Sequence, residues 1–256
     1  MSVDANAIFE EELAKHGVAF ERNGANEYRI QVGDLAVTTN LENARRNAER
    51  DGDPDVIRRF AARVLAVGSE PDLSWDEASG RLLLSAEACD HDFGDTIRLR
   101  VSDEVCGVLT LTDGEHGLVS WVSGERCADW GVTPERAVDA ALRNQDRLIA
   151  GLRLQIENVD GHKLGMVPLD SPFKASVIFA PSFKDLVAAD LGWPVWVVIP
   201  CRDFIYVVAE QSALVPRLGE VVVREFRESG YPITTEVLRV SSDGIEAVGT
   251  FPRSPG

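Results

Sequence analysis

The chain has 256 residues, of which 45 % are hydrophobic and 27 % are charged, a composition typical of folded globular proteins rather than disordered chains. Its 42 acidic and 26 basic residues give a formal net charge of −16. This charge argues against duplex nucleic acid and anionic membrane surfaces as partners, because both are bound through Lys and Arg. It is compatible with a basic protein partner, although acidity also serves solubility alone.

The N-terminal segment MSVDANAIFEEELAKHG lacks a basic region followed by an apolar run, so we expect no secretory signal. No stretch of the chain approaches the roughly 20 apolar residues that span a bilayer. The cysteines at positions 89, 106, 127 and 201 include no C-x-x-C pair, and without an export signal we interpret them as free thiols of a reducing compartment. The sequence therefore predicts a cytoplasmic protein.

Residues 1–68 are expected to form a compact α-β-β-α module. The first helix ends at Gly17, since glycine is a common residue just after a helix. Alternating apolar and polar residues over 18–38 predict a three-stranded meander. Two helices follow, the second beginning with Asp53 as its N-cap.

Residues 69–80 are polar and contain glycine and proline, so we predict a linker, followed by a larger α+β domain over 81–256. The elements expected in this domain are strands near 82–84, 97–101, 108–111 and 118–122, a helix over 133–150, a hairpin over 152–167, a helix over 182–192, strands at 195–199 and 204–208, a helix over 214–228, and strands at 237–240 and 245–248. Ser182 and Asp185 are expected to form a capping box at the start of their helix. Paired strands with helices between the pairs favour antiparallel sheets with helices packed on one face, an α+β fold, over a doubly wound fold.

Sequence motifs for cofactors and metals are missing. The glycines lie singly in turns, and neither a P-loop nor a G-x-G-x-x-G pattern occurs, so no nucleotide or other cofactor is implied. Cys89-Asp90-His91-Asp92 is the one cluster of metal-capable side chains. Four neighbours in sequence cannot all face one ion, so we interpret this segment as a polar surface loop and predict no metal site.

Cys201 is the strongest candidate nucleophile, because the charge of Arg202 beside it would favour a thiolate. It has no evident general base, and a buried cysteine at a strand end is the alternative interpretation. We therefore predict no catalytic residue.

Arg202 and Asp203 stand between the two most strand-like runs of the chain and are our first candidate binding residues. In a structural role, Asp203 would orient Arg202 through a charge-assisted hydrogen bond. In a functional role, Arg202 would present its guanidinium group to a carboxylate or phosphate of a ligand or partner. Trp75 and Trp130 are further candidates. An aromatic ring in the polar predicted linker either packs onto a domain or marks an interaction surface.

Several short segments resemble one known family. They are Asp129-Trp130-Gly131-Val132-Thr133 before a helix ending Ala140-Ala141-Leu142-Arg143-Asn144, then Pro181-Ser182-Phe183, the strand Val195 to Pro200 with Arg202-Asp203, and Tyr231-Pro232-Ile233-Thr234. This series resembles the YtpQ-like family of bacterial proteins of unknown function. Cys201 and Gln145 depart from the pattern, which would have a small polar and an apolar residue there. The resemblance implies a cytoplasmic bacterial protein and brings no activity to Arg202 or Asp203.

The sequence favours a non-enzymatic protein-binding module, of the adaptor or immunity type, whose acidic surface meets a basic partner. The alternative is a small-ligand-binding protein or an enzyme with its site around Arg202 and Asp203. A pocket lined by these two residues and other polar groups would favour the alternative, and a convex turn would exclude an enzyme site there.

Overall fold

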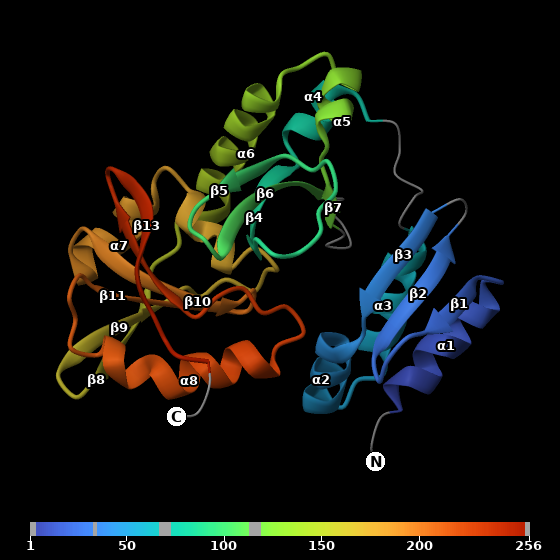
Figure 1. Cartoon of the computed structure of the whole chain (residues 1–256), viewed down its shortest axis with the longest axis horizontal. Helices are drawn as coiled ribbons and strands as arrows, with labels where there is room; N and C mark the ends of the chain where they lie inside the picture. Colours follow the sequence, from blue (N-terminus) through green and yellow to red (C-terminus); the bar gives the residue numbers. More distant parts are fainter. Residues whose placement is uncertain (1–3, 33–34, 67–72, 113–118, 254–256) are drawn as a thin grey trace. The chain divides into compact units, whose positions relative to one another are not determined.

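The computed structural model describes residues 4–32, 35–66, 73–112 and 119–253 (Figure 1). The chain divides into two compact units, Met1–Leu73 and Ser74–Gly256. Every strand pairing among the described residues is antiparallel, in three separate sheets, which confirms the α+β prediction. All five tryptophans belong to the second unit.

The first unit is a three-stranded meander with its helices on one face. Its elements are α1 (Ala5–Lys15), β1 (Ala19–Arg22), β2 (Glu27–Val32), β3 (Leu35–Asn40), α2 (Glu42–Asp51) and α3 (Asp55–Ala66). In β2, Tyr28 and Ile30 are buried, whereas the residues between and before them are exposed. Because alternate strand residues point to opposite faces, this pattern buries one face, which packs on Phe9 and Leu13 of α1 and Ile57 of α3.

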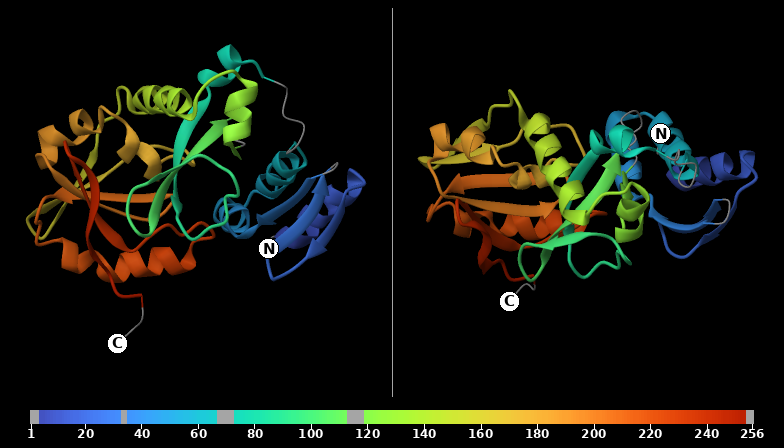
Figure 2. Two further views of the ribbon diagram at one scale, coloured as in Figure 1. Left: turned by 45° about the horizontal axis from the view of Figure 1, so that its top comes forward. Right: turned by 90° about the horizontal axis from the view of Figure 1, so that it is seen from above.

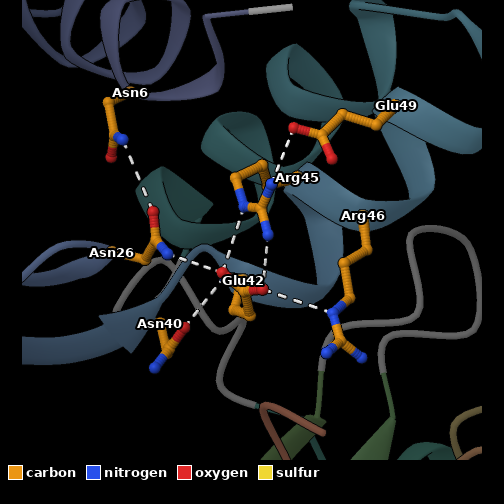
Figure 3. Close-up of polar contacts among 7 residues, drawn as sticks. All are labelled: Asn6, Asn26, Asn40, Glu42, Arg45, Arg46 and Glu49. Carbon is orange, nitrogen blue, oxygen red and sulfur yellow. Dashed lines mark hydrogen bonds and ion pairs between the residues drawn. The ribbon is translucent and has the colours of Figure 1, made fainter. Parts of the chain in front are cut away.

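A polar network centred on Glu42 joins this sheet to α2 (Figure 3). The carboxylate accepts hydrogen bonds from Asn26 Nδ2 (2.5 Å), Arg45 Nη2 (2.6 Å) and Arg46 Nε (3.2 Å). Asn40 Oδ1 accepts from the backbone N–H of Glu42 (2.8 Å), so it satisfies one of the free amides at the start of α2. The hydrogen bond from Arg45 holds the pKa of Glu42 below its usual value.

The second unit contains two sheets. Its elements are α4 (Trp75–Ser79), β4 (Leu82–Ala88), β5 (Arg98–Arg100), β6 (Val105–Thr112), β7 (Val119–Trp121), α5 (Gly124–Asp129), α6 (Pro134–Ile149), β8 (Gln155–Val159), β9 (His162–Met166), the 3₁₀ helix η1 (Ala175–Phe179), α7 (Phe183–Leu191), β10 (Val195–Cys201), β11 (Phe204–Ala209), α8 (Val215–Glu228), β12 (Glu236–Ser241) and β13 (Gly244–Thr250). Residues 69–72 of the expected linker (69–80) lie outside the described residues. Residues 75–79 of that segment form α4, so they are helical.

The six-stranded sheet has the order β13-β12-β10-β11-β9-β8. Along β10, Val195 and Val197 face the core formed with η1 and α7. Val198 faces the other way, into the core under α8 with Val208. Figures 1 and 2 show α8 on one side of the sheet and α7 on the other. The prediction of helices on one face therefore holds for the sheet of the first unit. Helices cover both faces of the six-stranded sheet.

The second sheet, of order β4-β6-β5 with β7 also paired to β6, packs against α6. Two buried or half-buried side chains of α6 fix the segments around it. Gln145 donates to the carbonyl oxygen of Ser176 (2.8 Å), and Asp146 accepts from both the backbone N–H and the hydroxyl of Ser182 (2.7 and 2.6 Å). The Ser182 hydroxyl thus bonds Asp146, and the capping box predicted with Asp185 is not formed within the described part of the chain.

Cys89 and Cys106 are joined by a disulfide with a Cα–Cα distance of 5.2 Å. The prediction of four free thiols is therefore wrong for this pair. The register of β4 and β6 sets Glu87 opposite Cys106, which brings Cys89 diagonally across on the same face. The two cysteines are 17 residues apart, and no local motif marks their pairing. Cys127 and Cys201 are buried free thiols.

Candidate functional site: the β10–β11 turn and the groove beside it

The candidate residues Arg202 and Asp203 form the two-residue turn of a hairpin. β-branched and aromatic residues dominate both strands, as extended half-buried backbone prefers. Cys201 pairs with Phe204 across the turn, after a register shift in β10. The hairpin and its turn are as predicted. The turn is anchored from outside, since the backbone N–H of Ala175 at the start of η1 donates to the Arg202 carbonyl oxygen (3.3 Å).

The Arg202 side chain turns into the protein. Its Nη2 donates to Glu87 Oε1 (2.6 Å), and its guanidinium carbon lies 4.4 Å from the centroid of the Tyr231 ring. Ser85 Oγ donates to the same oxygen of Glu87 (2.5 Å). Glu87, not the expected Asp203, is therefore the carboxylate that orients Arg202. The Nε of Arg202 is buried and has no hydrogen-bond partner in the described chain.

Cys201 is not poised as a nucleophile. Its side chain is buried, with 1 % of the residue exposed, and burial raises the pKa of the thiol. The expectation that Arg202 favours a thiolate is wrong, because that guanidinium is already paired with Glu87.

Asp203, by contrast, lines a groove with a volume of about 410 Å³. The groove lies where β8 and β11 begin and β9 ends, next to the loop that leads into η1. Its lining residues are Gln155, Met166, Val167, Pro168, Leu169, Asp170, Lys174, Asp203, Phe204, Ile205 and Tyr206. This volume falls within the range of roughly 300–1,000 Å³ that is usual for ligand sites.

Three charged side chains line the groove, those of Asp170, Lys174 and Asp203. Within the described residues, neither the carboxylates of Asp170 and Asp203 nor the ammonium group of Lys174 makes a hydrogen bond or ion pair. The rings of Phe204 and Tyr206 stack with centroids 6.3 Å apart and an interplanar angle of 19°. Phe204 is 41 % exposed and Tyr206 only 9 %. Burial raises the pKa of Tyr206 to about 12, so its hydroxyl stays protonated at neutral pH.

The other two candidate residues, Trp75 and Trp130, lie together on different elements. Trp75 begins α4, and Trp130 ends α5 as its C-cap. Their ring centroids are 6.0 Å apart. The Arg136 guanidinium lies 5.3 Å from the Trp75 ring and that of Arg126 lies 5.3 Å from the Trp130 ring. Trp75 thus packs on its own unit, the first of the two roles considered for it.

The groove contains residues that sequence reasoning missed. Asp170 and Lys174 both lie in the loop before η1, Lys174 as the N-cap of that helix, and no motif surrounds them. Phe204 and Tyr206 had a weak signal, since two aromatic residues two positions apart on a strand share a face. In the described ranges, no group of three or more His, Cys, Asp or Glu side chains is placed to hold a metal ion, and no helix is long and apolar enough to cross a membrane.

No protein-family model, curated protein or solved structure matches the chain.

Proposed function

We propose that this chain is a non-enzymatic protein-binding module that engages its partner through the groove beside the β10–β11 turn. One observation carries the proposal. A groove of about 410 Å³ is lined by Asp170, Lys174 and Asp203, whose charges are unpaired within the described chain. Charged groups set in a concave surface give a partner both a shape and a charge pattern to match.

Two further features support binding over catalysis and a basic partner over an acidic one. Cys201, the strongest candidate nucleophile, is buried with a raised thiol pKa. The net charge of −16 steers positively charged surfaces toward the protein.

The test is site-specific photo-crosslinking in extracts of the native host. A photoreactive amino acid replaces Gln155, an exposed residue of the groove, or Lys184, an exposed residue of α7 outside it. We expect a discrete protein adduct at position 155 that is missing at position 184 and is lost when Asp203→Arg is added. Equal adducts at both positions, or an adduct that survives Asp203→Arg, would refute the groove as the binding surface.

A small-ligand receptor is the second candidate function, favoured by the groove volume alone. Thermal-shift screening of metabolites against the wild type and Asp203→Asn separates it from the first. A compound that stabilises only the wild type, in a protein that gives no crosslinked adduct, would favour the receptor.

The family and the compartment are proposals as well. The motif residues around Trp130 and Arg202 support membership of the YtpQ-like family. The cytoplasmic location stays a proposal, and the Cys89–Cys106 disulfide argues against it, because such bonds persist in oxidising compartments. The redox state of this bond in rapidly quenched cells tests the location.

A further inference from the structure

We propose that Phe251-Pro252-Arg253 is a releasable C-terminal strap, which occupies a docking site for partner segments that carry an aromatic residue two positions before an arginine. The site lies on α8 and shares no residue with the groove beside the β10–β11 turn. The inference therefore goes beyond the proposed function and does not depend on it.

The first part of the site is a seat for the Phe251 ring. Phe251 is 9 % exposed, and its backbone N–H donates to the carbonyl oxygen of Thr235 (2.9 Å). A Cβ atom added at Gly219, within α8, would lie 3.1 Å from Cδ1 of the ring. Glycine destabilises the interior of a helix, but here it lets the ring approach the helix backbone closely.

The second part of the site surrounds the guanidinium group of Arg253. Its Nη2 donates to the Glu104 carboxylate, and its Nε donates to Thr235 Oγ1 (3.2 Å). The guanidinium carbon lies 4.4 Å from the centroid of the Phe226 ring. A carboxylate, a hydroxyl and an aromatic face together match the charge, the several N–H donors and the flat shape of arginine.

Both parts of the site lie along one side of α8. Gly219 and Phe226 are seven residues apart in this helix, about two turns, so they share a face. The C-terminal segment passes α8 after β13 (Figure 1). Glu104 and Thr235 precede β6 and β12, so separate segments complete the site. The site recognises an aromatic ring, a backbone N–H and an arginine two positions later.

The strap is held near the surface, which makes it releasable. The side chains of Arg253 and Glu104 are 43 % and 35 % exposed, and exposed ion pairs add little to stability. In β13, which leads into the strap, every residue except Ile245 is exposed. Terminal segments with few buried contacts open at a low free energy. A partner segment can therefore replace the strap while the second unit stays folded.

A partner segment has contacts open to it that the strap does not use. A cavity of about 190 Å³ adjoins Arg253 and Phe226 and extends to Asp90 and Asp103. It has room for the residue that follows the arginine of a longer segment. The net charge of −16 attracts a basic segment from a distance. Such added contacts offset the high effective concentration of a strap that belongs to the same chain.

The experiment titrates a labelled, blocked peptide, Gly-Thr-Phe-Pro-Arg-Gly, which copies residues 249–253, into two full-length proteins. One is the wild type, and the other is the open variant Phe251→Ala/Arg253→Gln. We expect the open variant to bind the peptide at least about 10-fold more tightly by fluorescence anisotropy, because its strap no longer competes. Alanine for phenylalanine, or citrulline for arginine, in the peptide should each weaken this binding at least about 10-fold.

Glu104→Gln, added to the open variant, tests the contact with the arginine of the peptide. It should weaken binding of the arginine peptide and leave binding of the citrulline peptide unchanged, since citrulline has no charge for Glu104 to pair with. Arg217→Gln in the wild type is the matched control. It breaks another exposed ion pair of α8, that with Asp160, and should bind the peptide as weakly as the wild type does.

Hydrogen exchange at the Phe251 amide of the wild type provides a test that needs no variant. The peptide in large excess should speed this exchange by displacing the strap from Thr235, and the citrulline peptide should not. A folded open variant that fails to bind, equal binding by both proteins, or exchange that excess peptide leaves unchanged overturns the inference. If the open variant does not fold, the exchange measurement alone decides.

Discussion

Arg202 is held by groups of different kinds, a carboxylate and a ring face. Its side chain is 22 % exposed and that of Glu87 10 % exposed, so the ion pair is largely removed from water. A pair in such a place adds little net stability, but breaking it leaves one charge desolvated without compensation. Arg202 therefore fixes the β10–β11 turn to β4, and Asp203 remains available to the groove.

A double-mutant cycle tests this role of Arg202. Glu87→Gln alone should lower the free energy of unfolding by about 2–4 kcal/mol, because it leaves the guanidinium buried and unpaired. The double variant Glu87→Gln/Arg202→Leu should lose much less unfolding free energy than the sum of the losses in the two single variants. Urea unfolding followed by tryptophan fluorescence measures all four proteins, and additive costs would show that the pair is not coupled.

Glu42 makes a pH-dependent contribution to stability in the first unit. Its folded pKa is lowered from the usual value of 4.5, so the contribution is complete above about pH 4.5 and is lost as pH falls through the lower folded pKa. Glu42→Gln should be less stable at neutral pH and should lose less stability on acidification. Urea titrations at several pH values, followed by the methyl signals of Ile30, report on this unit. If the unfolding free energies of wild type and variant fell in parallel as the pH is lowered, Glu42 would not be the source of this pH dependence.

At the level of elements, the disulfide links β4 to β6 beside Glu87. It closes a loop of 17 residues, and in the chain-entropy account such a crosslink stabilises by about 3 kcal/mol. The disulfide thus stabilises the position of β4, the strand that carries Glu87, whose carboxylate binds Arg202.

We expect reduction of this bond to lower the urea midpoint of the second unit by an amount equivalent to about 3 kcal/mol. The Cys89→Ala/Cys106→Ala protein should have the lower midpoint already and should not respond to reductant. Thiol titration of the unfolded, unreduced protein should find only Cys127 and Cys201. Four reactive thiols in that titration would show that the bond is not formed.

The elements and contacts differ in how well the local sequence predicts them. β10 and β11 were predictable because a run of β-branched and aromatic residues can hardly be anything but a buried strand pair. α6 was predictable from Thr133 and Pro134 at its start. The ion pair of Glu87 with Arg202 spans 115 residues, and the groove gathers residues from several separate segments. Such contacts depend on sheet order, which local patterns do not encode.

For the whole molecule, the net charge of −16 acts on stability as well as on binding. Like charges on a compact surface repel one another, and the unfolded chain relieves that repulsion by expanding. Salt screens surface charges beyond about 8 Å at physiological ionic strength.

The thermal midpoint should therefore rise as sodium chloride is added to a low-salt solution, since screening of net repulsion outweighs the loss of exposed ion pairs. Scanning calorimetry over a salt series measures this dependence. A midpoint that falls steadily with salt would mean that the surface ion pairs dominate.

Because tryptophan occurs in only one of the two units, spectroscopy can follow the unfolding of the two units separately. All five indole rings lie in Ser74–Gly256, and the first unit has Tyr28 as its single tyrosine. Emission excited selectively at the indole band therefore observes unfolding of one unit, whereas far-ultraviolet circular dichroism observes both. The difference between the two denaturation curves isolates the behaviour of Met1–Leu73 in the intact chain, without a label and without cutting the protein.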